Sequence, residues 1–185
     1  MNKPGKKDIY IIFEGPTEEK FIRKLQDTFF SNYNLYLINA KGKDNIIKEY
    51  KKVVRKVTIY SEVVVMYDLD RIDSVLSIYN YYMNKGINIK IRDIYFINPQ
   101  FELLFILAKS NKTPIDNYEL HIKNLYDIDH YSKKNKELDK IVKNISKEEL
   151  IELFVKLKKL LSKNDKELRS TNYDNLFNKL FEINK

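Results

Sequence analysis

Two apolar segments of the 185-residue chain each end in acidic residues, and the types and spacing of these acids suit the binding of a metal ion. One segment leads directly into Asp68 and Asp70, and Ile9–Phe13 leads into Glu14. If both are strands of one parallel sheet, their carboxyl ends lie at the same edge, where the acids would share a crevice. Packed carboxylates raise one another's pKa unless a cation joins them, and Mg2+ prefers such oxygen ligands. The sequence therefore predicts an acidic metal site.

The spacing of neighbouring acids extends this candidate set. Asp68 and Asp70 are two residues apart, so in an extended segment both side chains project from the same side. Asp73 either joins the cluster or begins the next helix, where an acid interacts favourably with the helix dipole. Glu18 lies close enough to Glu14 in the sequence to join the same set of metal ligands. Its position in the first turn of a helix also gives it an ordinary role, a favourable interaction with the helix dipole.

Residues beside the acids suit contact with phosphate. Gly15 allows a close approach to the backbone, and Lys20, Arg71 and the basic residues of Lys41–Lys56 would position a phosphate backbone. Glu102 is the only charge in the segment Phe-Glu-Leu-Leu-Phe-Ile-Leu-Ala. It is therefore either a first-turn helix acid or a functional group that reaches into the crevice.

Alternating strand and helix patterns predict the elements that position these residues. Strands are expected at residues 9–13, 35–38, 62–67 and 89–96. Helices are expected to begin near Thr17, Asp44, Ile72 and Gln100. Further helices are expected at residues 116–125, 135–144, 147–161 and 172–183. We expect a mostly parallel four-stranded α/β sheet in residues 1–112, with a helical C-terminal extension, residues 113–185, packed on it.

Composition excludes several classes of protein. The chain has 34 Lys and Arg against 26 Asp and Glu, a net charge of +8, which suits a polyanionic partner or reflects a compositional bias toward lysine. It has no cysteine, which excludes disulfides and zinc–thiolate sites. It has neither the P-loop motif Gly-x-x-x-x-Gly-Lys-Ser/Thr nor the dinucleotide-binding motif Gly-x-Gly-x-x-Gly. No signal peptide or membrane span is recognised, so we expect a cytoplasmic protein without a membrane partner.

The sequence Glu-Gly-Pro-Thr-Glu at 14–18, followed by Asp-Leu-Asp at 68–70, resembles a Toprim domain. That domain is the metal-binding catalytic module of topoisomerases, primases and overcoming-lysogenization-defect (OLD) nucleases. Three further segments are similar to the RloB-like proteins: Asn98-Pro-Gln-Phe101-Glu102-Leu-Leu, Tyr131-Ser-Lys, and Ser-Thr-Asn-Tyr-Asp-Asn-Leu at 170–176. Leu104 stands where that family has tryptophan, and Asp73 stands where a Toprim domain typically has glutamate.

The resemblance implies a Rossmann-like sheet with Mg2+ or Mn2+ held by Glu14, Asp68 and Asp70, and with Glu18 at a second position. It implies a metal-dependent nuclease acting in bacterial anti-phage defence, often beside a separate ATPase subunit. In such a nuclease Glu14 would be the general base or a second-metal ligand. RNA, particularly tRNA, and DNA are equally admissible substrates, and a homodimer is compatible with the sequence.

Three other functions are compatible with acids at strand ends. The first is a non-catalytic, metal-stabilised subunit that binds nucleic acid or a partner protein. The second is a phosphotransfer receiver domain, whose acidic pair follows its first strand, whereas here the pair follows a later strand. The third is a haloacid-dehalogenase phosphatase, whose Asp-x-Asp also follows the first strand and precedes Gly-Thr, where this chain has Arg71. The last two are disfavoured for those reasons.

Overall fold

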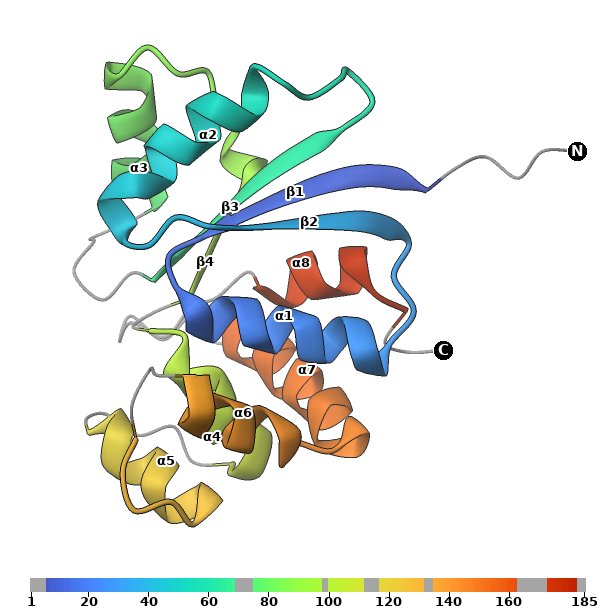
Figure 1. The fold of residues 1–185 in the computed structure, drawn as a ribbon, viewed down its shortest axis with the longest axis vertical. Coiled ribbons are helices and arrows are strands. Elements are labelled where there is room, and N and C mark those ends of the chain that lie inside the picture. Colours follow the sequence, from blue (N-terminus) through green and yellow to red (C-terminus); the bar gives the residue numbers. More distant parts are fainter. Residues whose placement is uncertain are drawn as a thin grey trace, which may run out of the picture.

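The computed structural model describes residues 6–68, 75–97, 100–111, 117–131, 135–162 and 173–182. Within these residues a four-stranded sheet carries helices on both of its faces (Figure 1). The α/β class predicted from the sequence is confirmed, and all the strand pairings of the sheet are parallel rather than most of them.

The sheet has the strand order β2-β1-β3-β4. Its strands are β1 (Lys7–Phe13), β2 (Tyr33–Asn39), β3 (Glu62–Asp68) and β4 (Ile94–Ile97). Ile12 of β1 lies opposite Ile38 of β2 on one side and Val65 of β3 on the other. The first and third strands therefore occupy the centre, which explains why both are strongly apolar: a central parallel strand is covered on two faces.

Helices cover each face of the sheet (Figure 1). One face carries α2 (Ile46–Val54) and α3 (Val75–Asn84), and the other carries α1 (Pro16–Thr28) and α8 (Tyr173–Leu180). Successive strand residues point to opposite faces. Ile12 and Val65 accordingly join the core under α2 and α3, while Ile11 and Val64 join the core under α1 and α8.

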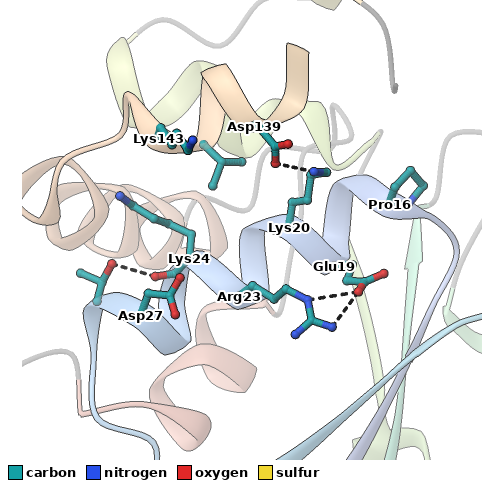
Figure 2. A pocket seen from close by; sticks show the side chains of 10 residues that line it. Pro16, Glu19, Lys20, Arg23, Lys24, Asp27, Asp139 and Lys143 are labelled. Carbon is teal, nitrogen blue, oxygen red and sulfur yellow. Dashed lines mark hydrogen bonds and ion pairs between the residues drawn. The ribbon is translucent and has the colours of Figure 1, made fainter. Parts of the chain in front are cut away.

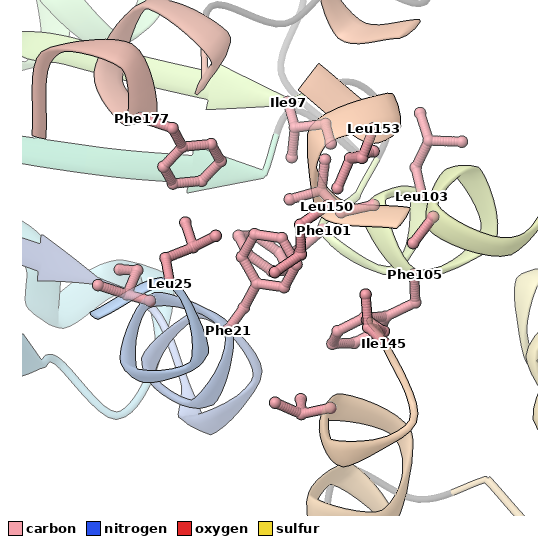
Figure 3. Packing of buried hydrophobic residues seen from close by; sticks show 14 of the residues in the cluster. Phe21, Leu25, Ile97, Phe101, Leu103, Phe105, Ile145, Leu150, Leu153 and Phe177 are labelled. Atoms are coloured by element: carbon pink, nitrogen blue, oxygen red, sulfur yellow. The ribbon is translucent and has the colours of Figure 1, made fainter. Parts of the chain in front are cut away.

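The remaining helices are α4 (Glu102–Lys109), α5 (Tyr118–Tyr126), α6 (Asn135–Lys143) and α7 (Lys147–Ser162). Helix α4 packs against α5 and α7, and α6 packs against α1. The ring of Phe21 in α1 lies 5.5 Å from that of Phe101, 6.0 Å from Phe105 and 5.7 Å from Phe177 (Figure 3). The C-terminal helices therefore share one hydrophobic core with the sheet.

Local sequence explains several element boundaries. A capping box forms at the start of α7: the Ser146 N–H donates to Glu149 Oε2 (2.8 Å), and the Glu149 N–H donates to Ser146 Oγ (3.2 Å). Helix α1 begins at Pro16, with Gly15 as its N-cap, one residue before the predicted start near Thr17, because proline suits the first turn of a helix. The predicted strand 89–96 is wrong in its first part, where residues 91–93 form a 3₁₀ turn. A similar turn, residues 43–45, precedes α2.

None of the helices in the described part of the chain is both long and apolar enough to cross a membrane.

Candidate functional site

The carboxyl ends of the two central strands meet at one edge of the sheet. β1 ends at Phe13, which Glu14 follows, and β3 ends at Asp68. Because β1 and β3 are paired neighbours, the two acids leave adjacent strands at the same edge. The negative charge of Glu14 contributes to the raised pKa of Asp68, so the two carboxylates interact.

Asp68 is a buried carboxylate among other acids. Its side chain is only 8% exposed, and its Oδ2 accepts a hydrogen bond from the Phe101 N–H at 3.2 Å. Oδ1 has no hydrogen-bond partner among the described residues. Burial raises the pKa of Asp68 well above its ordinary value, and the negative charges of Glu18, Glu102 and Glu14 raise it further. Both burial and repulsion therefore favour the neutral form, and a bound cation would reverse that preference.

Glu18 is also buried, although its sequence position suggests an ordinary first-turn acid. Thr17 and Glu18 lie in the first turn of α1 and are 2% and 4% exposed. Gly15 has an extended backbone that any residue adopts. A Cβ on Gly15 would lie 3.6 Å from Glu18 Oε2, an ordinary contact. Neither backbone conformation nor space therefore requires glycine at this position.

A pocket of about 220 Å³ opens beside Glu14. Residues 14–18 line it together with Lys41 and Gly42, which follow β2. The Gly42 N–H donates to the Glu14 carbonyl oxygen at 2.9 Å, and Gly42 has φ +124°, a conformation that favours glycine. The loop after β2 thus brings an exposed lysine next to the acids. Sequence reasoning included Lys41 only as the start of a basic stretch and missed Gly42; a Lys-Gly-Lys sequence after a strand was the available signal.

Glu102 is, after Glu18, the second buried acid near Asp68. It begins α4, is 2% exposed, and its Oε1 accepts a hydrogen bond from the Tyr131 hydroxyl at 2.9 Å. Burial raises the pKa of Tyr131, and the adjacent Glu102 charge adds to the shift. The structure therefore brings together Phe101, Glu102 and Tyr131, three residues from the segments similar to the RloB-like family, beside Asp68.

Two tyrosines form a buried pair close to Glu14. The hydroxyl groups of Tyr67 and Tyr82 are 2.7 Å apart. Burial raises the pKa of both phenols, and the charge of Glu14 adds to the shift at Tyr67. The ring of Tyr82 is fully buried and packs edge-on against Tyr50, so it belongs to the core rather than to a surface that stacks on bases.

Lys20 lines a separate groove rather than the pocket beside Glu14. Figure 2 shows Lys20 extending from α1 toward Asp139 of α6, with which it forms an ion pair. The groove has a volume of about 680 Å³ and is also lined by Arg23, Lys24 and Lys143. The Lys20 side chain is 18% exposed. To bind phosphate it would have to exchange its aspartate partner for the ligand.

Four predicted site residues, Asp70, Arg71, Asp73 and Asn98, lie outside the described residues. Among the residues that are described, no three aspartate, glutamate or histidine side chains are arranged to hold a metal ion. Asp68 still has the donor chemistry for one, because its Oδ1 is a buried oxygen without a hydrogen-bond partner in that part of the chain. A metal site here therefore requires a further ligand, and Asp70 is the predicted one nearest in sequence.

No family model, curated protein or solved structure matches this chain. The resemblance to Toprim and RloB-like proteins accordingly depends on the sequence motifs alone, and the family assignment stays a prediction.

Proposed function

We propose that the chain is a metal-dependent nuclease of the Toprim or RloB-like type, which hydrolyses phosphodiester bonds in RNA or DNA. One observation carries the proposal. Asp68 is buried at the carboxyl edge of the sheet among the negative charges of Glu18, Glu102 and Glu14. Buried like charges are costly unless a cation compensates for them. A role in binding a divalent cation accounts for this arrangement.

The acids fit a hard divalent cation such as Mg2+ or Mn2+, which takes oxygen ligands. In the proposed site Asp68 and Glu14 would hold the ion, and Glu18, Asp70 and Asp73 are the remaining candidate ligands. A bound ion of this kind would polarise the scissile phosphate and stabilise the departing oxygen.

The protein's own groups would orient the reactants and move the proton. The Phe101 N–H fixes the orientation of the Asp68 carboxylate. Glu14, half-buried beside the pocket, would accept the proton of the attacking water as a new P–O bond forms and the scissile P–O bond breaks. The exposed Lys41 beside it would contact a phosphate of the substrate backbone.

A basic surface next to this pocket would bind the rest of a nucleic acid. Residues 41–56 contain seven lysines and arginines and two acids. Five of the basic side chains are exposed on α2 and just beyond its end: Lys48, Lys51, Lys52, Arg55 and Lys56. Because contacts to phosphate release counterions, binding through such a surface should weaken steeply as salt is raised. The groove between α1 and α6 carries further cations, but on the other face of the sheet (Figure 2).

The test is incubation of the purified protein with plasmid DNA and with total tRNA, in Mn2+, in Mg2+ or in EDTA. We expect cleavage only with a divalent cation. Asp68→Asn and Glu14→Gln should each slow it by about 10²–10⁴-fold, the usual contribution of a positioned acid or base. Asp129→Asn, the same change as Asp68→Asn at an exposed acid, should cleave normally. Cleavage that continues in EDTA and in Asp68→Asn would refute the proposal.

The deep burial of the acids favours a second candidate function. Asp68, Glu18 and Glu102 are each less than a tenth exposed, which suits a structural ion as well as a catalytic one. The chain would then be a metal-stabilised subunit that binds nucleic acid or a partner protein, such as a separate ATPase in a defence complex. Cleavage separates the two functions: a nuclease should cleave as the wild type and lose about 10²–10⁴-fold in Glu14→Gln, whereas such a subunit should bind tRNA without cleaving it in either form.

A further inference from the structure

Strand β2 forms one edge of the sheet, and its outer side is unpaired in the described part of the chain. All seven of its residues pair with β1. The strand order places no other strand beside it (Figure 1). One side of Tyr33–Asn39 therefore presents backbone N–H and C=O groups without a strand partner. Long unpaired edges of this kind recruit other strands, and natural proteins usually protect them.

The usual protective features are missing from β2. The sequence Tyr-Asn-Leu-Tyr-Leu-Ile-Asn contains no charged residue, no proline and no glycine. Its register with β1 advances one residue at a time from Tyr33 to Asn39, so no β-bulge twists the edge away. An uncharged seven-residue segment with high β propensity is also the type of sequence that aggregates when it is left exposed. We therefore expect this edge to be covered in the working protein.

Apolar side chains continue on both sides of the strand. Tyr36 is 44% exposed, and its ring stacks on that of Tyr10 at 4.6 Å. Two hollows, of about 370 and 570 Å³, run beside β2. They are lined by half-buried Leu35 and, in one hollow, by the exposed Phe30. The surface around the unpaired edge can thus bury apolar side chains as well as form backbone hydrogen bonds.

We propose that the occupant of this edge is a second copy of the chain, paired through β2 in antiparallel fashion about a two-fold axis. An edge strand is self-complementary under such an axis, because each copy offers the donors and acceptors that the other lacks. The neutrality of β2 permits this pairing even though each chain carries a net charge of +8. The other edge strand, β4, has four residues, and β2–β4 pairing between copies would leave edges free and propagate into filaments.

The dimer would have one continuous eight-stranded sheet, four strands from each copy. Symmetric pairing of Tyr33–Asn39 with itself places Tyr36 opposite the Tyr36 of the partner. Because the two halves of the sheet run antiparallel, the two carboxylate edges would face opposite directions. This proposal does not depend on nuclease activity and would hold for a binding subunit.

The test is the mass of the full chain in solution across a concentration series, by sedimentation equilibrium or light scattering. We expect a dimer for the wild type and for Ile59→Lys, which places the same charge on a 90% exposed apolar side chain away from β2. Tyr36→Lys should weaken association about tenfold or more, because it removes an aromatic pair and opposes two like charges. Mixing Tyr36→Lys with Tyr36→Glu should restore dimers, a result that misfolded variants would not give.

Three results would overturn the proposal. The first is a wild-type chain that remains monomeric at the highest concentration tested. The second is a Tyr36→Lys chain that dimerises as tightly as the wild type. The third is a dimer that is lost in Ile59→Lys and kept in Tyr36→Lys, which would place the contact at the turn before β3.

Discussion

Substituting Asp68 by asparagine should stabilise the metal-free protein at neutral pH. The wild-type carboxylate is buried and repelled by Glu18, Glu102 and Glu14, so ionising it is unfavourable. Asparagine is neutral, and its oxygen can still accept the hydrogen bond that the Phe101 N–H donates to Asp68. Its amide N–H can also donate to a neighbouring carboxylate. The substitution therefore removes the repulsion without removing the contact.

The effect should depend on pH with a definite sign. Burial and the adjacent negative charges raise the pKa of Asp68 in the folded state above its ordinary value. Between those two values the folded protein binds more protons than the unfolded chain. The stability of the metal-free wild type should therefore fall as pH rises through that interval. Asp68→Asn lacks this group, so its advantage should appear at neutral pH and vanish in acid.

The magnitude follows from linkage. Each unit by which the pKa is raised corresponds to about 1.4 kcal/mol of destabilisation at high pH. For an acid this deeply buried we expect Asp68→Asn to gain about 1–3 kcal/mol, the usual range for buried polar groups without partners. In a chain of this size each kcal/mol shifts the melting temperature by about 2–4 °C. Thermal melts in EDTA at neutral pH should thus show a rise of roughly 2–12 °C.

Repeating the melts with Mg2+ should narrow the difference in melting temperature between the two proteins. A cation at ten times its dissociation constant stabilises the folded protein by about 1.4 kcal/mol. The wild type should gain this stability and Asp68→Asn should not. Asp129→Asn serves as the matched control and should behave as the wild type in both buffers. An Asp68→Asn variant that is less stable than the wild type in EDTA would refute the argument that Asp68 is destabilised by repulsion.

Three further substitutions test single contacts. Tyr131→Phe removes the hydroxyl that donates to buried Glu102 and should lower the free energy of unfolding by about 1–3 kcal/mol in urea; an unchanged midpoint would show that the bond adds nothing. Ser146→Ala breaks the capping box and should cost about 1 kcal/mol by thermal melt, with Ser146→Asp restoring most of it. Burial acts to raise the pKa of Glu62, but its ion pairs with Lys7 and Lys179 hold that pKa below its usual value. The stability that these ion pairs contribute is therefore lost as pH falls through the lowered pKa. Glu62→Gln should therefore flatten the acid side of the melting-temperature profile, and an identical profile would contradict this reasoning.

Much of the fold follows from patterns that the sequence carries locally. The apolar runs of β1 and β3 are long and bounded by acids, so both strands are predicted close to their observed positions. The predicted fourth strand begins several residues too early, because apolar and polar residues alternate over 87–91 (Ile-Asn-Ile-Lys-Ile), as they do in a half-buried strand. In the structure Ile89 packs under α3 and residues 91–93 turn before β4 begins. An alternating pattern in one short segment does not by itself distinguish a turn from a strand.

The candidate site was less predictable because it depends on packing between distant segments. Burial of Glu18 results from tertiary packing around α1, and a first-turn glutamate carries no local signal of that burial. The hydrogen bond from the Phe101 N–H to Asp68 joins residues 33 positions apart. The sequence identifies Asp68 from its place at a strand end and Phe101 through the family resemblance, but not the contact between them. Lys20 is predicted to contact phosphate beside the acids, but in the structure it pairs with Asp139 in a different groove.

The most direct test of the central claim is Mn2+ binding, measured from the loss of the free-ion electron paramagnetic resonance signal as protein is added. The claim is that Glu14 and Asp68, from neighbouring strand ends, hold one divalent cation together. We predict saturable binding by the wild type and by Asp129→Asn, with binding lost or greatly weakened in both Glu14→Gln and Asp68→Asn. Equal Mn2+ binding by all four proteins, or no binding by the wild type, would contradict it.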